Sequence, residues 1–212
     1  MRRAAREARM ALDLRPGERV YQEIKQAILS GEFVILQRLD IDKLAAQFGV
    51  SATPVRYGLA ILAAERLVKL NSSRVYQVAF WSEQELRELY QWRQRLTKWA
   101  LQSYVPEAAP AMSPDADYAG VYLTVMGHID RNANTEARRA GRSADERLQQ
   151  ALRAEDDALP GALDELHRIA ALLDRGGAPL ANKLRRYFDR RISHCALIRS
   201  AAHAKAMPNN GA

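Results

Sequence analysis

The sequence is short of cysteine and of long apolar runs. Its 212 residues include a single cysteine, Cys195, so neither a disulfide nor a cysteine-based metal cluster can form within one chain. That usage is typical of the reducing cytoplasm. No stretch approaches the ~18 apolar residues that a membrane helix needs, and no apolar core follows the N-terminal arginines as it would in a secretory signal. We therefore expect a cytoplasmic protein with no membrane segment.

Common signatures of catalysis are also missing. The sequence has no glycine-rich phosphate loop, no serine nucleophile elbow and no His-Glu-x-x-His motif. Cys195 follows His194, but neighbours on a helix point apart and do not make a nucleophile–base pair. These absences argue against an enzyme.

Positive charge is unevenly distributed along the chain. The formal net charge is +7, and 48% of the residues are hydrophobic, which is enough for the cores of two modest domains. Residues 1–80 hold 13 Lys/Arg against 8 Asp/Glu (+5), and the remainder holds 19 against 17 (+2). Basic residues gathered in the shorter segment favour a polyanionic partner, although an ordinary basic protein would show the same total.

Two short helical patterns that meet at Gly49 dominate residues 38–68. Asp40 stands where a side chain can cap the first helix, and Gly49 stands where a left-handed stop is easiest for glycine. Ser51 can cap the second helix, and Pro54 is tolerated in its first turn. The apolar faces at helical spacing are Ile41, Leu44, Ala45 and Phe48 in the first helix, and Val55, Leu59 and Leu62 in the second.

This is the helix-turn-helix pattern, in which the start of the second helix enters the major groove of DNA. Ala52, Thr53 and Arg56 would then point outward. Arg56 could contact a guanine edge or a phosphate, and Thr53 a phosphate or a thymine methyl group. Any two packed helices joined by a glycine turn would give the same pattern, so the flanking sequence must decide.

The flanks supply a preceding helix and a following hairpin. Residues 19–30 show a helical apolar face, and residues 68–78 alternate around the polar turn Asn71–Arg74. A hairpin directly after a recognition helix is typical of a wing, which offers its tip to a DNA backbone or minor groove. An ordinary surface hairpin is the alternative.

The second half shows only helical patterns. Ser82 and Glu85 predict a capping box at the start of a helix that continues to about Tyr104. Prolines at 106, 110 and 114 indicate a loop. Ser143 with Glu146 predicts another capping box. The later helices are predicted at 115–133, 143–158, 162–174 and 178–204.

The fold class is therefore mainly α: an N-terminal winged helix-turn-helix of three helices and a hairpin wing, then an all-α helical bundle. We predict a flexible basic arm over residues 1–18, a DNA-binding domain over 19–80, an all-helical domain over 81–205, and a tail over 206–212.

Several of these segments resemble the GntR family of bacterial transcription regulators. The resemblance lies in the helix Val20–Ile28, the turn Gly49-Val50-Ser51, the run Thr53-Pro54-Val55-Arg56, the run Glu65-Arg66-Leu67-Val68 and the wing Arg74–Val78. It implies a homodimer on double-stranded DNA at a near-palindromic operator, with repression the commoner outcome. The predicted DNA-contacting residues are Arg38, Ser51, Thr53, Arg56, Tyr57, Ser73 and Arg74.

The sequence departs from the family pattern in the turn and the wing. Ala52 replaces a usual arginine, and Tyr57-Gly58 replaces Glu-Ala. Ile35-Leu36 replaces Pro-Gly, and Val75 aligns with the glycine of the wing tip. The operator could therefore differ from the common one or be bound more weakly. A winged helix that docks a protein instead of DNA is the alternative function.

The helical half is similar to the FCD domain of the FadR-like subgroup, which implies that residues 81–205 form an effector-binding and dimerisation domain. That resemblance implies a divalent metal held by an Asp and three His, with a small organic acid as effector. Only His167 matches a ligand position, and Tyr187 or Phe188 occupies another, so we expect no metal cofactor. Arg93 could bind the effector carboxylate or pair with an acidic neighbour. A metal-dependent enzyme built around His128, His167 and His194 is a remote alternative.

Overall fold

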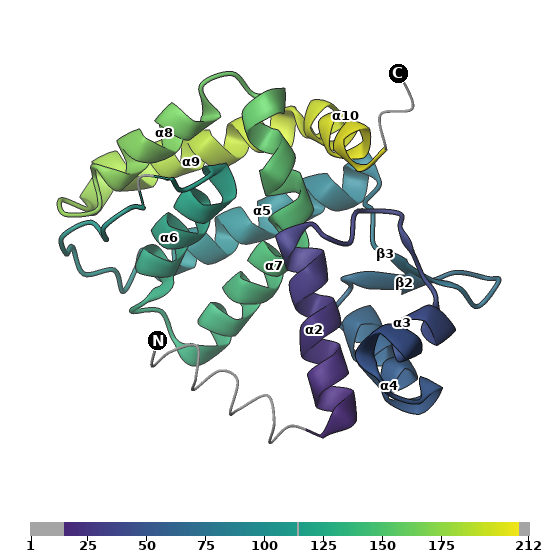
Figure 1. The fold of residues 1–212 in the computed structure, drawn as a ribbon. Coiled ribbons are helices and arrows are strands. Elements are labelled where there is room, and N and C mark those ends of the chain that lie inside the picture. The colour runs from purple at the N-terminus through teal and green to yellow at the C-terminus, as the bar shows by residue number, and fades with distance from the viewer. Residues whose placement is uncertain (1–14, 114, 208–212) are drawn as a thin grey trace. The chain divides into compact units, whose positions relative to one another are not determined.

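The computed structural model describes residues 15–113 and 115–207. The chain forms two compact units, Met1–Phe80 and Trp81–Ala212. The fold is mainly helical with one small antiparallel sheet, in agreement with the predicted class (Figure 1). The elements of the first unit are α2 (Pro16–Ser30), β1 (Arg38–Leu39), α3 (Ile41–Phe48), α4 (Ala52–Ala64), β2 (Val68–Leu70) and β3 (Tyr76–Val78).

The core of the first unit is built from the apolar faces that the periodicity identified. Helices α2 and α4 pack together, and α3 packs on α4. The buried residues of this core are Val20, Ile24, Ala27, Ile28, Phe33, Leu39, Leu44, Val55, Leu59, Leu62, Leu67, Val68 and Val78.

Helix α2 begins at Pro16, so the predicted boundary of the arm at residue 18 is wrong. Proline fits the first helical position because its fixed φ is already helical and its missing N–H would have no partner there. The N–H of Arg15 donates to Glu18 Oε2 at 3.3 Å, which satisfies another group of the first turn. The arm residues 1–14 lie outside the described residues.

The sheet contains a strand that the sequence did not predict. Its order is β1-β3-β2, and Arg38 of β1 lies opposite Gln77 of β3. Strand β1 is two residues long, too short for an alternation pattern, and its partner lies far along the chain. The hairpin of β2 and β3 matches the predicted wing.

The second unit is a helical bundle in which α5 packs against α6, α7, α9 and α10 (Figure 1). Its helices are α5 (Glu83–Ala100), α6 (Tyr118–Asp130), α7 (Thr135–Ala158), α8 (Ala162–Ala170), α9 (Gly177–Ser193) and α10 (Cys195–Ala206). The predicted capping box starts α5: the N–H of Glu85 donates to Ser82 Oγ at 3.1 Å, and the N–H of Ser82 donates to Glu85 Oε2 at 2.7 Å.

Other helix boundaries in the bundle were predicted wrongly. Helix α7 begins at Thr135, capped by Asn134, so Ser143 lies inside the helix and does not start it. The single helix predicted over 178–204 is broken at His194 into α9 and α10. Helix α10 also reaches Ala206, one residue into the predicted tail, and residues 208–212 are outside the described part of the chain.

Candidate nucleic-acid interface

The turn between α3 and α4 has the predicted geometry. Asp40 Oδ1 accepts hydrogen bonds from the N–H groups of Asp42 and Lys43 at 3.0 and 3.2 Å. The bond from Lys43, followed by that from Asp42, holds the pKa of Asp40 below its ordinary value. Gly49 ends α3 in the left-handed region at φ 63°, where a side chain would be strained. The chain then turns directly into α4.

Ser51 occupies the N-cap of α4 but makes no capping hydrogen bond through its side chain, contrary to the prediction. A serine cap usually accepts from the N–H of the third helical residue. That residue is Pro54, which has no N–H. The Ser51 hydroxyl and the first amides of α4 therefore remain available at an exposed helix start, where the helix dipole favours an anion.

All of the predicted DNA-contacting residues are exposed on the first unit: Arg38, Ser51, Thr53, Arg56, Tyr57, Ser73 and Arg74. In the described part of the chain, the side chains of Arg38, Arg56 and Arg74 make no hydrogen bond or ion pair. Three guanidinium groups are thus free to meet an external anion.

The wing tip is a tight turn that places Arg74 in a strained conformation. The N–H of Arg74 donates to the Asn71 carbonyl at 3.0 Å, and Asn71 Oδ1 accepts from the N–H of Val75 at 2.9 Å. Arg74 has φ 56°, so the left-handed residue of the wing tip is Arg74. The family pattern had placed the wing-tip glycine at Val75 instead. Leu36 also has a positive φ of 65°, at the position where the family has glycine.

Several residues that support this surface were missed by sequence reasoning. The hydroxyl of Tyr21 donates to Glu65 Oε1 at 2.6 Å, and Lys25 Nζ donates to Glu65 Oε2 at 3.0 Å, which ties α2 to the end of α4. A Cβ on Gly58 would lie 3.1 Å from the Tyr21 nitrogen, so this glycine permits the close approach of the two helices. The spacing of Tyr21 and Lys25 on one face of α2 was the only available signal.

Comparison with known proteins decides the family. Residues 16–76 match the model of bacterial regulatory proteins of the gntR family. The N-terminal unit is therefore similar to the GntR family. Proteins of this family are transcription regulators and not enzymes.

Two curated relatives of the N-terminal unit are named as repressors. The gluconate operon transcriptional repressor of Bacillus licheniformis is 36% identical over 74 residues, which are 35% of this chain and 30% of that protein. The transcriptional repressor GlaR of Escherichia coli K12 is 34% identical over 70 residues, which are 33% of this chain and 32% of that protein. The chain therefore aligns with only about a third of the length of these relatives.

Solved structures share the fold over most of the chain. A GntR transcriptional regulator from Rhodococcus sp. RHA1 has a TM-score of 0.70 at 22% identity, covering 85% of this chain and 97% of its own. McbR/YncC of E. coli has a TM-score of 0.58 at 15% identity, covering 86% of this chain and 98% of its own. These similarities establish the fold of the chain and nothing about its ligands.

Arg93, the candidate effector ligand, is buried inside the bundle. Its Nε and Nη2 donate to Asp145 at 2.7 and 3.1 Å, and both Nη atoms donate to Asp130 at 3.4 and 2.8 Å. Nη1 also donates to Thr97 Oγ1 at 3.1 Å. Burial by itself would lower the pKa of Arg93, but Asp145, Tyr122 and Asp130 together outweigh burial and raise the pKa. All five N–H donors of the guanidinium are used within the protein. Arg93 therefore pairs with acidic neighbours, which was the alternative to binding an effector carboxylate.

A second buried arginine sits near the position where the FCD resemblance implies a metal ligand. Arg191 Nε donates to Glu155 at 2.7 Å, and Nη1 donates to Glu165 at 2.6 Å. The guanidinium lies 3.5 Å from the ring centre of Tyr187, and its Nη2 donates to the Tyr118 hydroxyl at 2.8 Å. Burial, followed by the Glu155 charge, raises the pKa of Tyr118. The positive charge of the Arg191 guanidinium disfavours the binding of a metal cation at this position.

The histidines are not brought together. His167 and His194 lie on α8 and between α9 and α10, and His167 is exposed. His128 is buried in α6, with its ring edge-on to Tyr104 at 5.9 Å. Among the described residues, no three His, Cys, Asp or Glu side chains are placed to share a metal ion. No helix in the same residues is long and apolar enough to span a membrane.

Proposed function

We propose that the protein is a transcription regulator that binds double-stranded DNA as a homodimer at a near-palindromic operator. The observation that carries the proposal is Arg56: it is exposed and unpaired among the described residues, in the second turn of α4, within a GntR-type winged helix. A guanidinium there can reach the guanine O6 and N7 atoms in the major groove.

The other exposed groups suit phosphate contacts. Ser51 and Thr53 stand at the open N-terminus of α4, where a phosphate is favoured. Arg38 lies on β1 beside the wing, and Ser73 and Arg74 form part of the wing tip. Tyr57, which is 53% exposed, offers a ring to the apolar edge of a base. Phosphate contacts fix register, and base contacts give specificity.

A homodimer fits both the DNA and the bundle. Two-fold symmetry in the protein matches near-palindromic DNA. In the second unit, Trp92 and Trp99 are 44% and 50% exposed and lie one heptad apart on α5, which gives an apolar face for a second copy. Large exposed aromatic side chains are enriched at such interfaces.

Repression is the proposed direction, because two relatives of the N-terminal unit are named as repressors. Regulation by a small molecule would follow if the ligand binds the DNA-competent and incompetent states with different affinity. A protein with this role would work in the cytoplasm. The bundle would be an FCD-type domain whose interior is filled by ion pairs instead of a metal.

The decisive experiment is a titration of DNA selected from a random pool, at several salt concentrations. Specific affinity should fall steeply as salt rises, because bound phosphates release counterions. Arg56→Ala should cost about 1–3 kcal/mol of specific binding. Arg186→Ala, an exposed arginine of the other unit, is the matched control and should leave affinity unchanged. Unchanged affinity for Arg56→Ala would falsify its assignment, and salt-independent or absent binding would favour a protein-docking module.

A further inference from the structure

We propose that Arg15, at the start of α2, is a further DNA-contacting residue that binds a backbone phosphate beside the bases facing α4. The inference rests on the proposed function, because it requires that the first unit bind double-stranded DNA at the start of α4. It adds a contact that lies outside both the helix-turn-helix and the wing. Three observations carry it: the direction in which α2 packs on α4, the contact between the two helix starts, and the free guanidinium of Arg15.

Helices α2 and α4 lie side by side with their starts at the same end of the first unit (Figure 1). The contacting pairs advance in the same direction along both helices: Gly17 with Tyr57, Tyr21 with Gly58, and Lys25 with Glu65. Arg15 precedes the first of these pairs. The start of α2 therefore opens on the side of the unit that presents the exposed start of the recognition helix.

The contact between the two helix starts is close. A Cβ on Gly17 would lie 2.7 Å from Tyr57 Cδ1, so the glycine allows the tyrosine ring to lie directly against the first turn of α2. Tyr57 follows Arg56 in the second turn of α4. Phosphates flank the groove that a recognition helix enters, so a cation at this edge of α4 is placed for the DNA backbone and not for the bases.

The guanidinium of Arg15 is available for such a contact. Its side chain is exposed and makes no hydrogen bond or ion pair with another described residue. The carboxylate of Glu18 accepts from the backbone N–H of Arg15 at 3.3 Å. Arg19, one turn further along, instead donates from Nη2 to the Phe48 carbonyl at 3.4 Å, which ties α2 to the end of α3. Arg15 thus keeps its donors for a phosphate, which a guanidinium can hold through two parallel hydrogen bonds.

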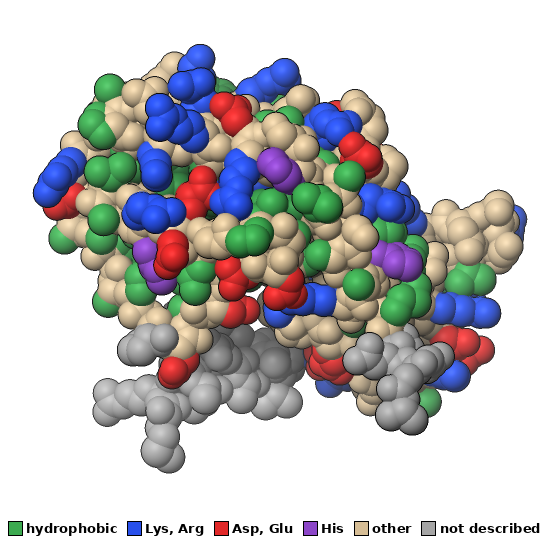
Figure 2. Space-filling model, turned by 90° about the horizontal axis from the view of Figure 1, so that it is seen from above, with side chains coloured by type: hydrophobic (Ala, Val, Ile, Leu, Met, Phe, Trp, Pro, Cys, Tyr) green, Lys and Arg blue, Asp and Glu red, His purple; other side chains and the backbone are tan. Residues whose placement is uncertain are grey.

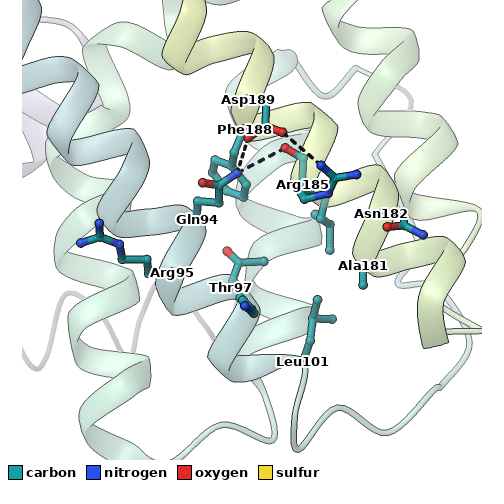
Figure 3. A pocket seen from close by; sticks show the side chains of 11 residues that line it. Gln94, Arg95, Thr97, Leu101, Ala181, Asn182, Arg185, Phe188 and Asp189 are labelled. Atoms are coloured by element: carbon teal, nitrogen blue, oxygen red, sulfur yellow. Dashed lines mark hydrogen bonds and ion pairs between the residues drawn. The ribbon is translucent and has the colours of Figure 1, made fainter.

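Cations of the helical unit are more closely matched by acidic residues. On the face shown in Figure 2, Lys and Arg side chains are interspersed with Asp and Glu. Between α5 and α9, Asp189 accepts from Gln94 Nε2 at 2.8 Å and lies 3.9 Å from Arg185 (Figure 3). The net charge of +5 over residues 1–80 against +2 over the remainder has the same trend. Arg15 therefore adds to a charge excess that belongs to the first unit.

Titration of the full chain with the selected duplex and with a scrambled duplex, at several salt concentrations, tests the contact. Arg15→Gln should weaken binding of both duplexes by about 3- to 10-fold and lower the slope of log affinity against log salt by about 1. The ratio of the two affinities should not change, because a phosphate contact is independent of sequence.

Arg66→Gln is the matched control. Arg66 is an exposed arginine of the same unit, two residues past the end of α4 and so away from its start. The substitution removes the same charge and should change affinity by no more than about two-fold, since salt screens a distant exposed charge. Circular dichroism confirms that both variants are folded.

A cleavage experiment locates the contact independently of affinity. An iron chelate that cleaves DNA is attached to Arg15→Cys or to Arg66→Cys; the native Cys195 is buried and does not compete for the label. The label at position 15 should cut the bound duplex beside the half-site, and the label at position 66 should not.

The Arg15 contact is overturned if Arg15→Gln matches Arg66→Gln in affinity and salt slope, or if the two labels cut DNA equally. The proposed function survives either result, provided that the unchanged protein binds the selected duplex. If the unchanged protein binds no DNA, the proposed function fails and the Arg15 contact fails with it.

Discussion

Ser51 begins α4 without a capping hydrogen bond because Pro54 stands at the third helical position and has no N–H to donate. The helix start is thereby left with unsatisfied groups at an exposed site. An N-cap serine ordinarily stabilises the fold. The Ser51 hydroxyl is instead free to bind a ligand. The contributions of Ser51 to stability and to DNA binding can therefore be measured separately.

Ser51→Ala should leave the free energy of unfolding almost unchanged, since no capping bond is lost, while weakening DNA binding and making it less salt-dependent. Ser82→Ala is the matched control. It removes a serine that does cap a helix and should cost about 1 kcal/mol without affecting DNA affinity. Denaturation followed by circular dichroism reports both units, and the three tryptophans, all at or after position 81, report the helical unit. Equal losses of stability in Ser51→Ala and Ser82→Ala would contradict the conclusion that the Ser51 hydroxyl makes no capping hydrogen bond.

Arg74→Gly should stabilise the first unit while impairing DNA binding. Arg74 has φ 56°, and glycine adopts this region without the cost of about 1 kcal/mol that a side chain imposes. Part of that gain is offset because glycine is freer in the unfolded chain. Thermal unfolding and operator titration measure the two effects. Arg74→Lys keeps both the charge and the Cβ, so it should change stability little and retain most of the affinity; loss of affinity with lysine would show that the planar guanidinium is needed.

The stability of the helical unit should fall as the solution is acidified through the ordinary pKa of histidine. Burial, reinforced by Arg131, lowers the pKa of His128. The folded protein therefore keeps His128 neutral below about pH 6.5, while the unfolded chain takes up a proton. The free energy of unfolding should decrease by at most about 1.4 kcal/mol per pH unit from this group.

His128→Phe retains an aromatic contact with Tyr104 and should remove this part of the pH dependence. Tryptophan fluorescence during urea unfolding between pH 7.5 and 5.5 provides the measurement. His167→Gln alters an exposed histidine and should leave the profile as it is. Identical pH profiles for His128→Phe and the unchanged protein would show that a group other than His128 causes the pH dependence of stability.

The purified protein should contain no stoichiometric divalent metal. A metal site needs several imidazole or carboxylate donors at one point. The guanidinium of Arg191 is instead held against Tyr187, where it repels a cation. Elemental analysis after purification without chelators tests this prediction, and one equivalent of zinc, nickel or manganese per chain would overturn it.

Local signals in the sequence predicted much of the first unit. The apolar periodicity gave the core faces of α3 and α4, and Asp40 and Gly49 marked the ends of α3. The exposure of Arg56 followed from its position opposite that core face. These features depend on residues a few positions apart, so a linear pattern contains them.

Features that depend on distant residues could not be found in this way. The pairing of Arg93 with Asp145 spans 52 positions, so the sequence left open whether Arg93 meets an effector or a carboxylate of its own chain. The break at His194 and the short strand β1 likewise have no strong local signal. The left-handed turn at Arg74 was misplaced by one residue because glycine, its usual marker, is absent.

The sequence by itself determined the succession of helices, the basic first unit and the exposed start of the recognition helix, because short-range periodicity and capping encode them. Tertiary structure alone decided that the arginines at 93 and 191 are buried among carboxylates. Burial and charge pairing depend on which elements meet in space, and that information is spread over the whole chain.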